Sequence, residues 1–305
     1  VVILESTTNP GTTLEIVMPI LEKSSKLIAG EDFLLGYSPE RIDPGNEKWT
    51  FKNTPKIVSG INKKSLEKIS EFYKLIIDEV VEVSGTREAE MVKLIENTYR
   101  QVNIAMVNEL AILSNMLDID IWEVVEAAKT KPFGFQSFRP GPGVGGHCIP
   151  IDPKYLSFKT RQIGQPVRFV ELAQEINNSM PNYVVARISE LMNKKEILLK
   201  NSKILILGVA YKKDIGDTRE SPALDIIESL LEKSVDISYY DPHVDELTLN
   251  KRSIAREENL ENLSNFDLIL IHTPHSKFQE INFDSVASLI FDSTGSFTIS
   301  NANRL

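Results

Sequence analysis

The stretch TREAEMVKLIENTYRQVNIAMVNELAILSNML, residues 86–117, decides the fold, because it separates parts of the chain that differ in character. Residues 86–131 contain neither glycine nor proline, and their apolar residues recur at helical spacing. This pattern predicts one long helix over residues 87–117 and a short helix over residues 121–129. We expect so long a helix to span between domains.

On both sides of this stretch, strand-like runs alternate with helical ones, which predicts mostly parallel sheets covered by helices. Before the stretch, the sequence predicts strands at residues 1–5, 33–37, 56–59 and 79–83, and helices at 13–23 and 63–77. After it, the sequence predicts strands at 203–208, 236–240, 266–272 and 289–292, a helix at 221–233, and helical residues 167–194 with a new helix starting at Pro181.

The expected fold class is therefore α/β, with two Rossmann-like parallel-sheet domains joined by a central domain built on the long helix. We expect an incomplete N-terminal Rossmann domain at residues 1–85, the central helical domain at 86–200 and a C-terminal α/β domain at 201–305. The chain begins on a strand-like run, without an initiator methionine, and we expect a segment to precede it.

Bulk composition excludes several classes of protein. The net charge of -9 argues against nucleic acid as the main partner, because phosphate backbones need basic surfaces. A single cysteine forms no internal disulfide, which fits the reducing cytoplasm. No apolar run approaches the length that crosses a bilayer, so we expect no membrane partner. One cysteine and scattered histidines also predict no metal site.

The segment Gly141-Pro-Gly-Val-Gly-Gly-His-Cys-Ile-Pro-Ile-Asp-Pro153 carries the clearest chemical signal. Five of the fifteen glycines and five of the fifteen prolines lie in residues 132–153. Such a loop brings backbone close to a ligand and holds its shape, and Cys148 precedes a predicted helix start at Asp152-Pro153. That position favours a thiolate nucleophile. A small buried thiol in a tight loop is the alternative.

Polar residues on the long helix form a second signal. Lys93 and Asn97 are four residues apart and share a face, and Asn108 follows eleven residues later on the same stripe. Their surroundings are mostly apolar, so these side chains need partners. A bound substrate would supply them; a lysine reaching solvent and hydrogen bonds between helices are the alternative.

Loops that follow predicted strands supply further candidates, since α/β sheets bind ligands at the carboxyl ends of their strands. Thr7 and Glu40 follow the first two strands, with a local turn or an exposed acid as the alternatives. In the last domain, residues 207–223 run from a strand into a helix without G-x-G-x-x-G spacing, and carry Lys212, Lys213 and Arg219. They could hold a diphosphate, or form a solvated basic turn.

Together and in this order, these motifs resemble the UDP-glucose/UDP-mannose dehydrogenase family over essentially the whole chain. The resemblance rests on the motifs Gly145-Gly-His-Cys-Ile-Pro-Ile-Asp152, Lys93 with Asn97, Ser38-Pro-Glu-Arg41, and Tyr211-Lys-Lys-Asp with Asp217-Thr-Arg219. Within the family, Pro132-Phe-Gly-Phe135 and residues 37–45 look most like the branch that acts on UDP-N-acetylglucosamine. The alternatives within the family are oxidation of UDP-glucose or of UDP-N-acetylmannosamine.

The resemblance implies a four-electron oxidation of a UDP-sugar with NAD as cofactor, through a thiohemiacetal and a thioester on Cys148, in a homodimer or larger oligomer. It implies that Lys93 and Asn97 stabilise an oxyanion, and that Glu40 and Asp152, with a water near Thr7, transfer protons. The residues expected to bind substrate are Glu40, Lys93, Asn97, Asn108, Arg139, Gly143, Gly145, Gly146, Tyr211 and Lys212, and those expected to contact the cofactor are Thr7, Glu40, Cys148 and Arg219.

The family's G-x-G-x-x-G is absent before the first strand, so we expect these residues alone to bind UDP-sugar, to bind NAD very weakly and to show no turnover. Two rival functions remain. One is a nucleotide-sugar sensor without activity, and the other is a thiol hydrolase that uses His147 and Cys148, whose side chains tend to point apart as neighbours in an extended loop.

Overall fold

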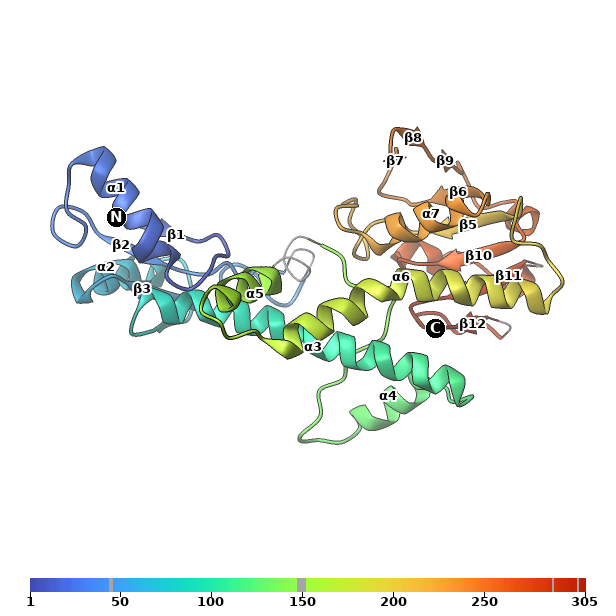
Figure 1. Ribbon diagram of the computed structural model, residues 1–305, viewed down its shortest axis with the longest axis horizontal. Helices are drawn as coiled ribbons and strands as arrows, with labels where there is room; N and C mark the ends of the chain where they lie inside the picture. Colours follow the sequence, from blue (N-terminus) through green and yellow to red (C-terminus); the bar gives the residue numbers. More distant parts are fainter. Residues whose placement is uncertain (44–45, 147–151, 287, 301) are drawn as a thin grey trace. The chain divides into compact units, whose positions relative to one another are not determined.

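The computed structural model describes residues 1–43, 46–146, 152–286, 288–300 and 302–305. The chain divides into two compact units, which are described separately below (Figure 1). Unit 1 comprises Val1–Arg100 and Ile151–Val167, and unit 2 comprises Gln101–Pro150 and Arg168–Leu305. Helix α3 (Thr86–Met116) begins in unit 1 and ends in unit 2, so the long helix predicted from the sequence is present.

Unit 1 is built on a four-stranded sheet of order β1-β2-β3-β4. The pairs β1–β2 and β3–β4 are parallel, whereas β2 and β3 are antiparallel. The sheet is therefore mostly parallel, as predicted. Its strands are β1 (Val2–Leu4), β2 (Leu35–Tyr37), β3 (Lys56–Gly60) and β4 (Val80–Glu82), and its helical segments are a π-helical turn (Thr13–Val17), α1 (Met18–Ser25), α2 (Lys63–Lys74), the start of α3, and α5 (Asp152–Gln162).

Two small cores cover the faces of this sheet. On one face Val58 packs against Ile69 and Tyr73 of α2. On the other, Tyr37 and Ile57 pack against Ala89 at the start of α3. Helix α2 begins where the side chain of Asn62 accepts a hydrogen bond from the Ser65 N–H at 2.8 Å, a favourable N-cap.

Unit 2 is built on a parallel six-stranded sheet of order β12-β11-β10-β5-β6-β9. The order of the first strands, with β5 central, β6 and β9 on one side and β10 on the other, places a topological switch point between β5 and β10. The strands of this sheet are β5 (Lys203–Leu207), β6 (Asp236–Tyr240), β9 (Ala255–Arg256), β10 (Leu268–Ile271), β11 (Leu289–Asp292) and β12 (Asn303–Arg304).

The central strands of unit 2 are buried on both faces. Ile204 and Ile206 of β5 belong to a core that includes residues of α6 (Arg168–Lys194) and α7 (Pro222–Glu232). Leu205 and Leu207 point into a second core on the opposite face. Such strands read as continuous apolar runs, as KILIL does here. The remaining segments of unit 2 are α4 (Ile121–Lys129), the β7 (Thr248–Leu249) and β8 (Arg252–Ser253) hairpin, and 3-10 turns at Leu263–Asn265, Ser276–Glu280 and Phe283–Ser285.

The prediction that Pro181 starts a new helix is wrong. Helix α6 runs without interruption from Arg168 to Lys194 with Pro181 inside it. A proline within a helix leaves one backbone carbonyl without its helical donor, at a cost in stability. The burial of Met180, Val184 and Val185 on both sides of Pro181 offsets that cost.

Candidate active site

A buried carboxylate on α3 holds the loop that follows β1. Glu90 accepts hydrogen bonds from the Gly11 N–H at 2.6 Å, from the Thr13 N–H at 2.8 Å and from the Thr13 hydroxyl at 2.7 Å. Free N–H groups at the start of a helix normally attract an anionic ligand. Here the protein's own carboxylate binds them, so the loop is tied to α3. This loop carries Thr7.

Asp152 is the centre of a polar cluster in unit 1. Its side chain is only 3% exposed and accepts hydrogen bonds from Asn97 on α3 and from the Thr7 hydroxyl. Burial raises the pKa of Asp152 above its ordinary 3.8, although hydrogen bonds from Asn97 and Thr7 and the charge of Lys93 act in the opposite direction. The structure thus brings together four residues that the sequence predicts for the site: Thr7, Lys93, Asn97 and Asp152.

Glu40 lies in a second polar network of unit 1. One oxygen accepts the Ile42 N–H at 2.6 Å, and the other is 3.7 Å from Lys56 Nζ. The Lys56 ammonium is also 2.9 Å from Glu5 Oε1, and the Tyr73 hydroxyl donates to the same oxygen at 2.7 Å. Burial alone would raise the pKa of Glu5, but the hydrogen bonds from Lys56 and Tyr73 lower it below its ordinary value. Lys56 therefore favours the ionised form of Glu5 and lies beside Glu40, a role that the sequence did not reveal.

The glycine loop, residues 141–146, packs within unit 2. A Cβ atom on Gly145 would lie 2.7 Å from Glu220 O and 2.8 Å from Tyr211 Cβ. One on Gly146, at φ +91°, would lie 2.8 Å from the Tyr211 ring. Glycine is therefore required here by the close approach of Tyr211. Cys148 and His147 lie outside the described residues.

Asn108 on α3 is hydrogen-bonded to the glycine loop. Its Oδ1 accepts the Gly141 N–H at 2.9 Å, and its Nδ2 donates to Asn177 on α6 at 3.0 Å. Asn177 in turn donates to the Gln101 carbonyl at 3.2 Å. Asn108 is fully buried and its polar atoms have partners inside the protein, so it holds the loop in position.

Of the basic residues predicted to contact ligands in unit 2, two arginines are paired with carboxylates of the protein. Arg219 forms hydrogen bonds from Nε and Nη2 to both carboxylate oxygens of Asp217, at 2.6 to 3.1 Å. Arg139 is exposed and pairs with Glu126 at 2.8 Å. Lys212 is half-buried next to Tyr211. The two arginines would have to exchange these surface pairs for a ligand, which exposed pairs do at small cost.

A buried aspartate also holds the loop after β5. Asp241 Oδ2 accepts the Val209 N–H at 2.8 Å, the Ala210 N–H at 3.1 Å and His275 Nε2 at 3.0 Å. Asp241 Oδ1 accepts the His243 N–H at 2.8 Å. Despite its Rossmann-like strand order, this sheet therefore offers no free N–H groups at residues 209–210 for a dinucleotide phosphate. No sequence motif marks Asp241, because three of its four partners lie 31 to 34 residues away.

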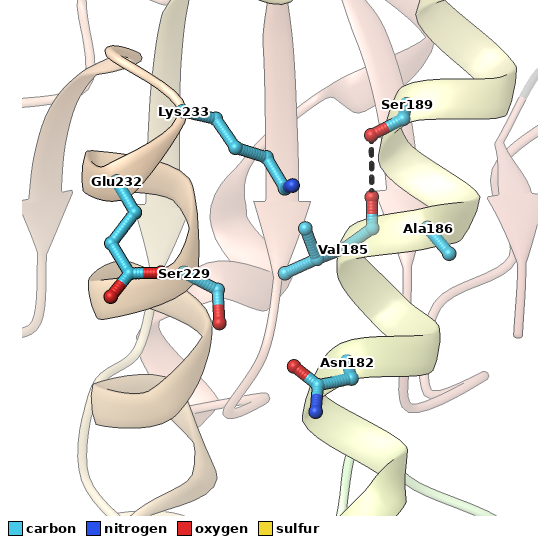
Figure 2. A pocket seen from close by; sticks show the side chains of 7 residues that line it. All are labelled: Asn182, Val185, Ala186, Ser189, Ser229, Glu232 and Lys233. Carbon is cyan, nitrogen blue, oxygen red and sulfur yellow. Dashed lines mark hydrogen bonds between the residues drawn. The ribbon is translucent and has the colours of Figure 1, made fainter.

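A hollow of about 330 Å³ lies between α6 and α7 (Figure 2). Lys233 extends into it from the end of α7, and the Ser189 hydroxyl turns back to the Val185 carbonyl of its own helix at 2.9 Å. None of its lining residues is one that the sequence predicts for the site; they are Asn182, Val185, Ala186, Ser189, Ser229, Glu232 and Lys233. The residues that the sequence predicts for the site lie elsewhere, in the Asp152 cluster of unit 1 and in the glycine loop of unit 2.

Three family models match the chain, and all describe the UDP-glucose/GDP-mannose dehydrogenase family. The NAD binding domain matches residues 1–77, the central domain residues 87–179 and the UDP binding domain residues 205–302. The chain belongs to this family. The resemblance stated from the motifs is confirmed, with the correction that the family name pairs UDP-glucose with GDP-mannose. Membership identifies the chain as an NAD-dependent oxidoreductase of nucleotide sugars.

Individual relatives agree with this assignment. Protein CapL of Staphylococcus aureus is 36% identical over 97% of this chain and 70% of its own length. UDP-N-acetyl-D-glucosamine 6-dehydrogenase of Salmonella typhi is 37% identical over 94% and 67%. The structure of UDP-D-ManNAc dehydrogenase from Pyrococcus horikoshii superposes with a TM-score of 0.88, at 32% identity, over 100% of this chain and 71% of that one. Several UDP-N-acetyl-D-mannosamine dehydrogenases of Methanococcus match over about 62% of their length.

One buried polar atom of unit 1 is available to a ligand such as NAD. Asn9 Oδ1, in the loop after β1, is buried without a hydrogen-bond partner in the described part of the chain, and an amide N–H of a ligand would satisfy it. The N–H groups at the start of the following helix are bound by Glu90, so they do not hold a pyrophosphate. Over the described residues, no helix is long and apolar enough to span a membrane.

Proposed function

We propose that the chain oxidises the C6 hydroxyl of a UDP-sugar, most specifically UDP-N-acetylglucosamine, to the uronate, as a step toward a surface polysaccharide precursor. The observation that carries this proposal is the buried Asp152, hydrogen-bonded to Asn97 and Thr7 and close to the charge of Lys93. Asp152 follows Cys148 by four residues in the sequence, so a nucleophile and a proton-transfer cluster are close along the chain.

In the proposed reaction, two molecules of NAD, bound one after the other, would each supply the acceptor for one hydride from C6, which accounts for four electrons. The Cys148 thiolate adds to the C6 aldehyde from the first oxidation and forms a C–S bond. Lys93 and Asn97 stabilise the oxyanion of that adduct. After the second oxidation, water attacks the thioester carbon, the C–S bond breaks, and Cys148 leaves as thiolate.

Proton transfer is assigned to Asp152 and Glu40. An ionised Asp152 whose pKa is raised by burial is a stronger base than an exposed aspartate, which suits it to take a proton from water held near Thr7. Asn97 and Thr7 fix its orientation. Glu40 is held by Lys56 and the Ile42 N–H, and serves as the second acid–base group or as a substrate contact.

The proposed substrate and cofactor contacts extend into unit 2. We propose that the glycine loop with Gly143, Gly145 and Gly146 binds the UDP-sugar, supported by Asn108 and bordered by Tyr211. Lys212 and Arg139 would contact the diphosphate side, since their charges complement it. Arg219 would contact the cofactor. We also propose domain limits near residues 85 and 200, and function in the reducing cytoplasm, where Cys148 stays a free thiol.

The test compares sugars under one condition. The protein is given NAD together with UDP-N-acetylglucosamine, UDP-N-acetylmannosamine or UDP-glucose, and the rate of NADH formation is compared among the three sugars. We expect two NADH per UDP-N-acetylglucosamine and a much lower kcat/KM with the other two sugars. Preference for another sugar would correct the substrate, whereas tight binding without NADH would favour a sensor.

We further propose that the chain forms a homodimer or larger oligomer through α3. Within unit 2, this helix exposes large apolar side chains at Met106, Leu110, Leu113 and Met116. Such a stripe is costly to leave in water. Light scattering should give at least twice the chain mass, and Leu110→Glu should lower it. A monomer at micromolar concentration would contradict the proposal.

A further inference from the structure

Three loops of unit 2 bring the carboxylate of Asp214 together with the imidazoles of His243 and His275. Asp214 follows β5, His243 follows β6 and His275 follows β10, so all three lie at the carboxyl ends of adjacent parallel strands (Figure 1). One ligand atom from each lies within 4.8 Å of the others. Asp214 Oδ1 is 3.8 Å from His275 Nδ1 and 4.0 Å from His243 Nε2.

The hydrogen bonds of His275 fix the tautomer that a metal ligand needs. Its Nε2 faces the buried carboxylate of Asp241 at 3.0 Å, and its Nδ1 accepts the Asp214 N–H at 2.9 Å. Nε2 therefore carries the proton, and the lone pair of Nδ1 points toward Asp214. Histidines that bind metals usually donate their other ring nitrogen to a carboxylate in this way.

Asp214 and His243 are also held in place by hydrogen bonds to neighbouring residues. Both oxygens of Asp214 accept hydrogen bonds from Ser276, from the N–H at 2.8 Å and from the hydroxyl at 2.7 Å. The His243 N–H is bound by Asp241, and its carbonyl lies against Gly216, where a Cβ atom would approach to 2.3 Å. Its imidazole is 40% exposed, and its ring centre lies 5.0 Å from that of His275. The backbone is thus fixed, and the ligand atoms keep some freedom to adjust.

We propose that Asp214, His243 and His275 form a binding site for a first-row divalent cation, with zinc as the best match to two imidazoles and one carboxylate. Tetrahedral zinc places its ligand atoms about 3.4 Å apart. Because the atoms now lie 3.8 to 4.8 Å apart, they would have to approach one another by about 0.4 to 1.4 Å, mainly through the side chain of His243. The hydrogen bond from the Asp214 N–H to His275 would be replaced by the metal.

The site has a clear structural consequence. Lys212 lies two residues before Asp214, so a cation would fasten the loop of Lys212 to β6 and β10. This proposal differs from the expectation drawn from the sequence, which was that the chain has no metal site. The three residues are 29 and 32 positions apart, without motif spacing, so only the fold brings them together.

The test is calorimetric titration of ZnCl2 into the protein in the Cys148→Ser background, because a thiol would compete for zinc. We expect one zinc per chain, and at least roughly 100-fold weaker binding after His243→Ala, whose exposed side chain can be removed without disturbing the core. Asp245→Asn removes a nearby exposed carboxylate and should leave zinc affinity unchanged. Substitution with Co²⁺ should give visible absorption bands of a tetrahedral site, and these should disappear in His243→Ala.

Binding should also raise the melting temperature of the parent protein but not of the His243→Ala variant, since a ligand stabilises only the state that binds it. Circular dichroism checks that the variant folds. The proposal is overturned if the parent binds no zinc, or if His243→Ala binds it as tightly as the parent does. Its failure would leave the proposed dehydrogenase function untouched, because no catalytic step uses this site.

Discussion

In each of the two sheets, the loop that follows the first strand is held by a carboxylate of the protein, but the two carboxylates come from different places in the fold. In unit 1 the backbone N–H groups of Gly11 and Thr13 are bound by Glu90, and in unit 2 those of Val209 and Ala210 are bound by Asp241. In both, a protein carboxylate occupies a place that suits a ligand's phosphate.

The difference lies in where each carboxylate comes from. Glu90 belongs to α3, three residues before Lys93 and seven before Asn97, so it ties the Thr7 loop to the helix that carries two of the proposed catalytic residues. Asp241 follows β6 of its own sheet and is held by His275 and His243. On the proposed function, unit 1 would align the groups that react, whereas in unit 2 Asp241 holds the start of the loop that carries Tyr211 and Lys212.

The largest effect is expected from Asp152→Asn, which tests whether unit 1 holds the chemistry. Loss of a positioned base should lower kcat about 100- to 10,000-fold with little change in UDP-sugar binding. The base works only when ionised, so wild-type activity should fall as the pH drops through a pKa above 3.8, and the variant should lack this acid limb. Asp78→Asn, at an exposed carboxylate of unit 1, is the control. An unchanged kcat would place the chemistry elsewhere.

Glu90→Gln tests whether the carboxylate that holds the loop of unit 1 affects both stability and catalysis. The amide would point an N–H group at donors that now meet an oxygen, and we expect unfolding free energy to fall by about 3 kcal/mol. Because Thr7 would lose its alignment with Asp152, kcat should fall as well. Denaturant unfolding and steady-state rates measure the two effects, and Glu88→Gln, exposed on the same helix, should change neither. If stability fell while kcat stayed normal, the hydrogen bonds of Glu90 would stabilise the fold without aligning the catalytic residues.

Asp241→Asn is the matching change in unit 2. It should lower unfolding free energy by about 2 kcal/mol, because a buried carboxylate with four hydrogen bonds is replaced by a neutral amide. A looser loop should raise the KM for UDP-sugar and leave kcat close to normal. If kcat fell as far as in Glu90→Gln, the contrast between the units would be wrong.

The smallest effect concerns His272, which is buried at the end of β10. Burial lowers its pKa from 6.5 to about 4, and its Nε2 has no hydrogen-bond partner in the described part of the chain. The unfolded chain binds this proton more readily, so His272 contributes stability above pH 6.5 that is lost as the pH falls toward about 4. NMR titration should find the ring neutral at pH 5.5. A midpoint near 6.5 would contradict this assignment.

Much of the fold follows from local pattern. The strands at Asp236–Tyr240 and Leu289–Asp292 have the predicted limits, since apolar runs bounded by turn residues leave little choice of ends. Pro181 was misjudged because its effect depends on buried neighbours that the sequence does not place in space. The β2–β3 antiparallel pair likewise depends on which strands meet, not on their composition.

The site was predicted in part, for the same physical reason. Lys93 and Asn97 could be paired by helical spacing, and Asp152 by its loop. Glu90 was missed although it lies on the same helical face, because an acid on α3 gains its role only from a loop 77 and 79 residues away. Lys56 and Asp241 were missed likewise.

The most direct test of the account is the chemical state of Cys148 during turnover. The Asp152→Asn variant, incubated with NAD and UDP-N-acetylglucosamine and quenched in acid, is analysed by intact mass and peptide mapping. Because hydrolysis is slowed while the thiolate remains, we predict a covalent UDP-sugar adduct on the peptide that contains Cys148, absent when Cys148→Ser is added. NADH production without any adduct, or uronate formation at a normal rate in Cys148→Ser, would contradict the account.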